Sequence, residues 1–113
     1  MPHFLVSFPA SAMADLSPEE LAQASVDSHA AIEDAKAAGV YVFGGGIDTS
    51  VAPVSVNGHG EVSAPTYPGY ALDGGFAVLR VASQDEAVAW AARLAAACRC
   101  PQEVRRFGDD PAS

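Results

Sequence analysis

Basic residues are scarce in this sequence, and their scarcity excludes two classes of partner. The 113 residues include 6 Lys and Arg against 14 Asp and Glu, which gives a formal net charge of −8 and a pI near 4.5. An acidic chain of this kind is repelled by the phosphates of nucleic acids and by anionic membrane surfaces. We therefore expect no nucleic-acid partner and no membrane partner.

Long apolar runs are also missing, because no run approaches the length of about 18 residues that a transmembrane helix needs. Half of the residues are nevertheless apolar and only 18% are charged, a composition that favours a folded chain over a disordered one. The length fits one domain over residues 1–113, with a loose tail over residues 108–113. The start of the chain lacks the basic stretch of a signal peptide, so we expect a cytoplasmic protein.

Cysteine occurs only twice, as Cys98 and Cys100. No second cysteine pair and no histidine at zinc-finger spacing follows, and a disulfide between such near neighbours is geometrically awkward. We expect two ordinary thiols and no metal site. The glycine run 44–46 matches neither the P-loop nor the dinucleotide-binding fingerprint, so it indicates a bend at the end of a strand, and we expect no cofactor.

Capping signals and hydrophobic periodicity predict two helices and several short strands. Ser17, Pro18 and Glu20 open a helix with a capping box, and Gly39 ends it. A second box starts at Ser83, and that helix ends before Pro101. The apolar faces are expected at Leu21, Ser25, Ser28, Ile32 and Ala35, and at Ala87, Trp90, Ala91, Leu94 and Cys98. Strands are expected over residues 3–8, 40–43, 51–56, 61–64, 76–82 and 103–107.

The order of these elements predicts the fold class. It reads β-α-β, an inserted hairpin, then β-α-β, which places the chain in the α+β class. Right-handed crossovers and short connections fold that order into an antiparallel sheet with both helices on one face, the ferredoxin-like plait.

Two of the predicted strands are apolar on both faces. Apolar residues lie on both faces of each strand: Ala77, Leu79 and Val81 alternate with Phe76 and Val78, and Val40 and Val42 alternate with Tyr41 and Phe43. Two helices can cover only one face of the sheet. The uncovered face would leave a large apolar patch, so we expect a second copy of the chain to cover it in a homodimer. Arg80 shares the alternation of Phe76 and Val78, and it either pairs across that interface or lines an anion-accepting cavity.

His29 is the residue best suited to proton transfer near neutral pH. It lies at the border of the apolar stripe of the first helix, with Ser25 and Glu33 one turn before and after it. A histidine at a helix boundary, paired weakly with Glu33, is the alternative interpretation. If a catalytic pair exists, Asp48 is its expected acidic partner, although an aspartate after a glycine run also forms turns.

A small-molecule ligand would be contacted by a further group of residues. Tyr67 and Tyr70 lie in a loop that could form a lid, or could pack on the domain's own surface. The candidate ligand-binding residues are Ser7, Tyr67, Tyr70 and Arg80.

Four separated blocks resemble the YCII-related (YciI-like) family, in its DGPF-domain branch. They are residues 37–46, 74–76, 85–93 and 103–105, and the resemblance extends from Phe4 to Phe107. It implies a dimeric α+β barrel of ferredoxin-like subunits. It also implies similarity in fold to muconolactone isomerase-like proteins, and some relatives act as lyases or dehydrochlorinases on small ring compounds.

The same resemblance implies an acid/base pair of a histidine on the first helix and an aspartate after the first strand. His29 matches the histidine, but the aspartate position falls in residues 9–11, which hold no carboxylate, and residues 63–68 replace the DGPF motif. The sequence therefore favours a small-molecule-binding or regulatory module with a cleft near the first helix. The alternative is a lyase or isomerase that uses His29 as general acid/base.

Overall fold

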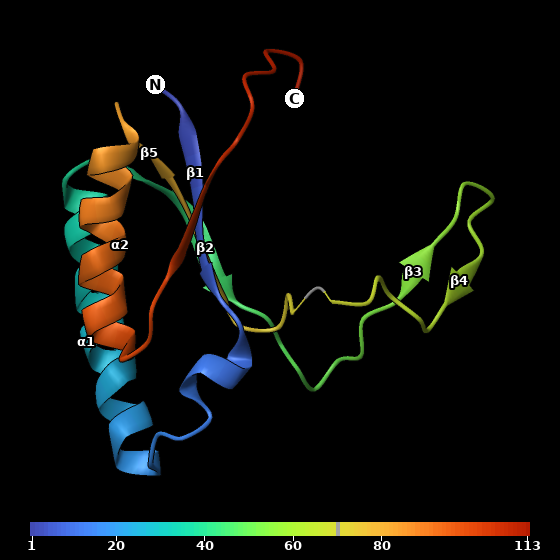
Figure 1. Ribbon diagram of the computed structural model, residues 1–113, viewed down its shortest axis with the longest axis horizontal. Helices are drawn as coiled ribbons and strands as arrows, with labels where there is room; N and C mark the ends of the chain where they lie inside the picture. Colours follow the sequence, from blue (N-terminus) through green and yellow to red (C-terminus); the bar gives the residue numbers. More distant parts are fainter. Residues whose placement is uncertain (70) are drawn as a thin grey trace.

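Two helices pack on one side of an antiparallel sheet of four strands, so the chain has an α+β fold (Figure 1). The structure is a computed structural model and describes residues 1–69 and 71–113. The elements are β1 (His3–Phe8), a 3-10 helix η1 (Ala10–Met13), α1 (Pro18–Ala37), β2 (Tyr41–Gly46), β3 (Ser55–Val56), β4 (Val62–Ser63), β5 (Gly75–Arg80), α2 (Gln84–Cys98) and β6 (Glu103–Arg106).

The sheet has the order β2-β5-β1-β6, and each neighbouring pair is antiparallel. In the register of the central pair, Phe4 lies opposite Leu79 and Leu5 opposite Val78. Directly opposed residues point to the same side of a sheet. One face therefore carries Phe4 and Leu79 toward the helices, and the other carries Leu5 and Val78 away from them.

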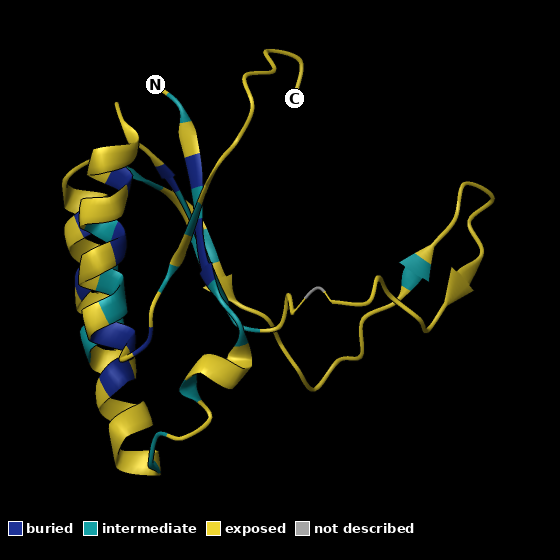
Figure 2. Cartoon of the chain, viewed as in Figure 1, coloured by how far each residue is buried: buried dark blue, intermediate teal, exposed yellow. Residues whose placement is uncertain are grey.

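The core lies between the sheet and the helices, where Figure 2 shows the buried residues gathered. Phe4, Val6, Leu79 and Val81 are almost fully buried there. They pack with apolar residues of α2, namely Ala87, Trp90, Ala91 and Leu94. This α2 face is the one predicted from the sequence.

The helix starts follow the predicted caps, with one difference. At α1 the Ser17 hydroxyl accepts from the Glu20 amide at 3.1 Å, and the Glu20 carboxylate accepts from the Ser17 amide at 3.0 Å. The predicted capping box is therefore confirmed. At α2 the Ser83 hydroxyl accepts from the Glu86 amide, but the Glu86 carboxylate accepts from the Ala82 amide, one residue before the cap.

The predicted buried face of α1 is partly wrong. The buried residues are Ala24, Ala31 and Ala35, whereas Leu21 and Ser25 are exposed. Alanines on this face let α1 lie close against α2, and Ser28 and Ile32 remain half-buried beside them. The helix turns its smallest side chains to its neighbour, which a stripe chosen by hydrophobicity does not reveal.

Strand β2 also differs from the prediction, because the glycine run continues the strand. Gly44, Gly45 and Gly46 pair with Ala77, Phe76 and Gly75 of β5. A Cβ on Gly44 would lie 2.7 Å from the Phe76 carbonyl oxygen, so this close pairing requires glycine. The run is therefore an edge of the sheet and not the bend that we expected.

A register shift in β2 between Tyr41 and Phe43 separates two aromatic residues that simple alternation places together. Tyr41 lies opposite Leu79 and packs against the core, whereas Phe43 lies opposite Val78 on the far side of the sheet. We call this far side the open face, since the helices cover only the other side (Figure 1). It carries Leu5, Ser7, Phe43, Phe76, Val78, Arg80 and the Glu103–Arg105 ion pair.

The predicted hairpin is present but much shorter than expected, since β3 and β4 have two residues each. It belongs to a long excursion between β2 and β5, residues 47–73, which we call the arm. Figure 1 shows the arm projecting from one end of the sheet, away from the helices.

Among the described residues, no helix is long and apolar enough to cross a membrane.

Candidate functional site

A cleft of about 220 Å³ lies between the helices and the sheet, at the end where β1 finishes and β5 begins. Both helices contribute to it, α1 through Ser28, His29 and Ile32, and α2 through Leu94 and Cys98. The rest of its lining comes from the strand ends and the segment before β6, namely Val6, Phe8, Gly45, Gly46, Gly75, Phe76, Ala77 and Gln102. The lining is mainly apolar, with a few polar groups.

Glycine shapes the sheet side of this cleft. A Cβ on Gly75 would lie 2.6 Å from the Phe8 ring, and a Cβ on Gly74 would lie 1.9 Å from the Phe8 carbonyl oxygen. Only residues without a side chain let the start of β5 approach the end of β1 so closely. The Gly74-Gly75 pair therefore fixes where the Phe8 ring lies in the cleft wall.

His29 is exposed and contributes a polar group to the cleft. Its Nδ1 lies 3.4 Å from the Ser25 hydroxyl, one turn earlier in α1, and the Ser28 hydroxyl donates to the Ser25 carbonyl oxygen at 3.1 Å. The ring can both donate and accept hydrogen bonds. These contacts tie the polar wall of the cleft to the backbone of α1.

The opposite wall carries a thiol and an amide. Burial raises the pKa of the Cys98 thiol, and its neighbour Cys100 raises it further, so Cys98 is a neutral, apolar part of the wall at neutral pH. The Gln102 amide nitrogen donates to the Cys100 carbonyl oxygen at 3.3 Å, which orients the side chain. Gln102 lines the cleft, and its amide oxygen can accept a hydrogen bond.

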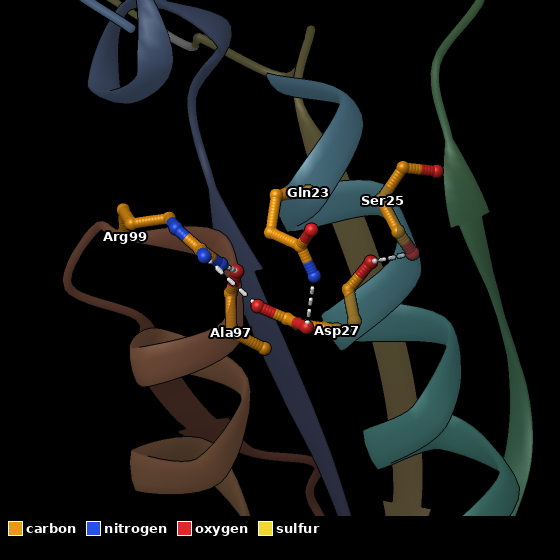
Figure 3. A network of polar contacts seen from close by, with 6 residues as sticks. Gln23, Ser25, Asp27, Ala97 and Arg99 are labelled. Atoms are coloured by element: carbon orange, nitrogen blue, oxygen red, sulfur yellow. Dashed lines mark hydrogen bonds and ion pairs between the residues drawn. The ribbon is translucent and has the colours of Figure 1, made fainter. Parts of the chain in front are cut away.

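A polar network joins the two helices beside the cleft (Figure 3). The Asp27 carboxylate accepts from the Gln23 amide at 2.9 Å and forms an ion pair with Arg99 at 2.8 Å. The hydrogen bond from Gln23, followed by that from Arg99, lowers the pKa of Asp27. Arg99 caps α2 in a left-handed conformation, with φ of 57°, and also donates to the Ala97 carbonyl oxygen. The network thus holds the C-terminal end of α2 against α1.

The structure does not bring Asp48 to His29. Asp48 lies at the start of the arm and does not line the cleft. Its carboxylate accepts from the Ser50 hydroxyl at 2.6 Å and from the Ser50 amide at 3.0 Å, and these bonds lower the pKa of Asp48. Asp48 therefore forms an aspartate turn, which is the alternative to a catalytic role at this position. Asp73, at the other end of the arm, accepts from the Ala10 amide at 3.0 Å.

Three of the four candidate ligand-binding residues, Ser7, Tyr67 and Arg80, also lie away from the cleft. Ser7 is buried but belongs to the open face, on the other side of the sheet. Arg80 is on the open face too, at the end of β5 farthest from the cleft. Tyr67 lines hollows within the arm, and Tyr70 falls outside the described residues. Among the predicted site residues that the structure describes, only His29 lines the cleft.

Several residues that line the cleft were not singled out as site residues from the sequence. Ile32 and Cys98 were placed on apolar stripes, and Gln102 carried no signal because it lies between a helix and a strand. In the part of the chain that the structure describes, no cluster of three His, Cys, Asp or Glu side chains could hold a metal ion.

No protein-family model matches this chain, and no curated protein matches it.

Proposed function

We propose that this protein binds a small, mostly apolar molecule that carries one hydrogen-bonding group, in the cleft between the helices and the sheet. The observation that carries the proposal is the composition of the cleft. Its walls are apolar at Val6, Phe8, Ile32 and Leu94, while His29, Ser28 and Gln102 supply polar groups. Binding sites for small molecules combine an apolar lining with a few placed polar groups in this way.

The size of the cleft sets the size of the ligand. A cavity of roughly 150 Å³ can hold benzene, and pockets for drug-sized ligands start at about 300 Å³. At about 220 Å³ this cleft fits a single ring with one substituent. We therefore take phenol as the probe, with toluene as its match in size that lacks the hydroxyl group.

Binding fits the surroundings of His29 better than proton transfer does. A histidine oriented by a carboxylate is a common acid/base arrangement, whereas the hydrogen-bond partner of His29 is the Ser25 hydroxyl. The two aspartates at the ends of the arm are occupied by Ser50 and by the Ala10 amide. We propose that His29 donates to or accepts from a polar group of the ligand.

The finer fold assignment is part of the same proposal. The strand order β2-β5-β1-β6, with both helices on one side, is the arrangement expected of a ferredoxin-like plait with a hairpin inserted. It agrees with the sequence resemblance to the YCII-related family in its DGPF-domain branch, and we propose membership of that family.

The open face supports a homodimer. Phe43 is 71% exposed there, next to the half-buried Leu5, Phe76 and Val78. Continuous apolar patches of this kind mark interaction surfaces. We propose that two copies meet through their open faces, which would enclose the sheets in a dimeric α+β barrel.

Isothermal titration calorimetry with phenol and toluene tests the ligand proposal. We expect phenol to bind with a Kd near or below about 1 mM, which corresponds to about −4 kcal/mol. Ile32→Trp fills the cleft and should weaken phenol binding at least about tenfold. Val26→Trp is the matched control, because Val26 is on the same helix but 63% exposed and outside the cleft. Equal phenol affinity in both variants contradicts the proposal.

A further inference from the structure

The arm is an exposed excursion of the chain between β2 and β5. Its two ends are held together at the sheet, where the Ile47 amide donates to the Gly74 carbonyl oxygen at 2.9 Å. From that base it projects to the side away from the helices, and Figure 2 shows it exposed along nearly all of its described length. The radius of gyration is 15.6 Å, against about 13 Å for a compact chain of this length.

The arm exposes more apolar surface than an isolated hairpin can keep in water. Val51, Val54 and Leu72 are 67%, 56% and 62% exposed, and Ile47, Val56 and Val62 are exposed as well. A two-stranded hairpin is marginal in water without packing, and here each strand has two residues. Ile47, Val51, Pro53 and Leu72 also line one groove of about 710 Å³. These exposed apolar side chains mark the arm as a candidate interaction surface.

The distribution of charge indicates which surface the arm would contact. The arm carries Asp48, Glu61 and Asp73 and no Lys or Arg. Among residues 1–69 and 71–113, five of the six basic side chains form ion pairs, and Arg80 is the exception. Arg80 lies exposed on the open face, beyond the apolar residues of that face. An acidic apolar arm and an apolar face with an unpaired cation are complementary, and one chain carries both.

The geometry places these two surfaces at opposite ends of the same sheet. Strand β5 runs from Gly75, at the base of the arm, to Arg80 at its other end. When two open faces meet about a two-fold axis perpendicular to the strands, the arm end of one sheet lies at the Arg80 end of the other. The symmetry then makes the same contact twice.

We propose that the arm of one copy packs against the open face of a second copy, with an arm carboxylate beside the partner copy's Arg80. This inference rests on the proposed homodimer and adds the orientation of the two sheets and the second contact surface. The exchange covers the apolar arm, pairs the remaining cation and closes the interface symmetrically.

Isotope-filtered NMR on a mixture of ¹³C-labelled and unlabelled wild-type protein tests the exchange. We expect intermolecular NOEs between methyl groups of Val51, Val54 or Leu72 in one copy and Phe43 or Val78 in the other. Intermolecular NOEs between open faces alone overturn the arm exchange and leave the dimer intact. A mass of 11.6 kDa without intermolecular NOEs overturns both. Phenol binding in the cleft is measured separately, so its outcome is independent.

A matched pair of variants gives a second test. Leu72 on the arm and Val26 on α1 are 62% and 63% exposed, so replacing either with aspartate adds the same charge at the same exposure. Leu72→Asp should raise the dimer dissociation constant at least about tenfold, the size of effect that a buried apolar contact has in an interface. Val26→Asp should leave it unchanged. Equal dissociation constants for the two variants overturn the proposal.

Discussion

Tyr41 and Phe43 lie on opposite faces of the sheet although one residue separates them in β2. Tyr41 faces the helices opposite Leu79, with Lys36 5.6 Å from its ring centre, while Phe43 lies opposite Val78 on the open face. The register shift between them produces the difference. In this strand one aromatic ring therefore packs against the core, and the other lies exposed on the open face.

Because the two rings lie on opposite faces, replacing Tyr41 and replacing Phe43 with alanine should have different effects. Tyr41→Ala should lower the free energy of unfolding by about 2 kcal/mol, since it removes a half-buried ring from the core. Phe43→Ala should change the unfolding of the subunit by less than about 0.5 kcal/mol, because the ring is exposed in the single chain, but it should weaken the dimer. Urea titration followed by Trp90 fluorescence, at a protein concentration at which the single chain is populated, measures the effect on unfolding, and light scattering measures the effect on the proposed dimer.

Light scattering on the wild-type protein tests whether it forms the proposed dimer. We expect twice the chain mass of 11.6 kDa at micromolar concentration. A monomer under these conditions contradicts the proposed role of the open face.

Substitution of His29 tests its contact with ligand. His29→Ala should reduce phenol affinity by about 2- to 10-fold, the range expected for one hydrogen bond, while toluene affinity stays unchanged. His59→Ala is the matched control, because His59 lies in the turn of the hairpin and outside the cleft. If the two variants bind phenol equally well, His29 does not contact the ligand.

The Asp27–Arg99 contact should make stability depend on pH in the acid range. The pKa of Asp27 is lowered in the folded state, so its contribution to stability is present above the ordinary carboxyl range. That contribution is lost as the pH falls through the folded-state pKa. Asp27→Asn should therefore be less stable than wild type at about pH 7, and the difference should shrink below about pH 4.

Urea midpoints of both proteins across this pH range measure the effect. Asp15→Asn, a change at an exposed aspartate before α1, is the control and should parallel wild type. A difference between wild type and Asp27→Asn that is independent of pH contradicts the assigned ion pair.

Cys98 and Cys100 are free thiols, and burial raises the pKa of both. Since the thiolate is the reactive form, a thiol reagent should modify native protein slowly, at a rate that still rises above about pH 9. Denatured protein should titrate two thiols without prior reduction. Fewer than two titratable thiols, or stoichiometric zinc, contradicts this description.

Local signals allowed much of the fold to be predicted from the sequence. Ser17 with Glu20 marked the start of α1, and Gly39, with φ of 75°, follows its end. The course of β2 was not predictable in this way. Its glycines form a strand only because β5 supplies partners 29 to 33 residues further along the chain, and the register shift at Val42 is likewise set by that pairing.

The candidate site shows the same limit. The position of His29 beside an apolar helix face could be read from spacing within one helix. Asp48 was expected nearby because its side chain follows the glycine run, but the arm begins there and leads the chain away from the cleft. Gln102 lines the cleft because the segment between α2 and β6 passes beside it, and no local sequence pattern predicts that position.

The most direct test of the ligand proposal is a map of phenol binding on the isotope-labelled wild-type protein. Two-dimensional NMR during a phenol titration reports which amides change. We predict the largest shifts at Ser28, His29, Cys98 and Gln102, which line the cleft from both helices and from the segment before β6. Saturable shifts confined to the arm or to the open face, or no saturable shifts at all, contradict the proposed function.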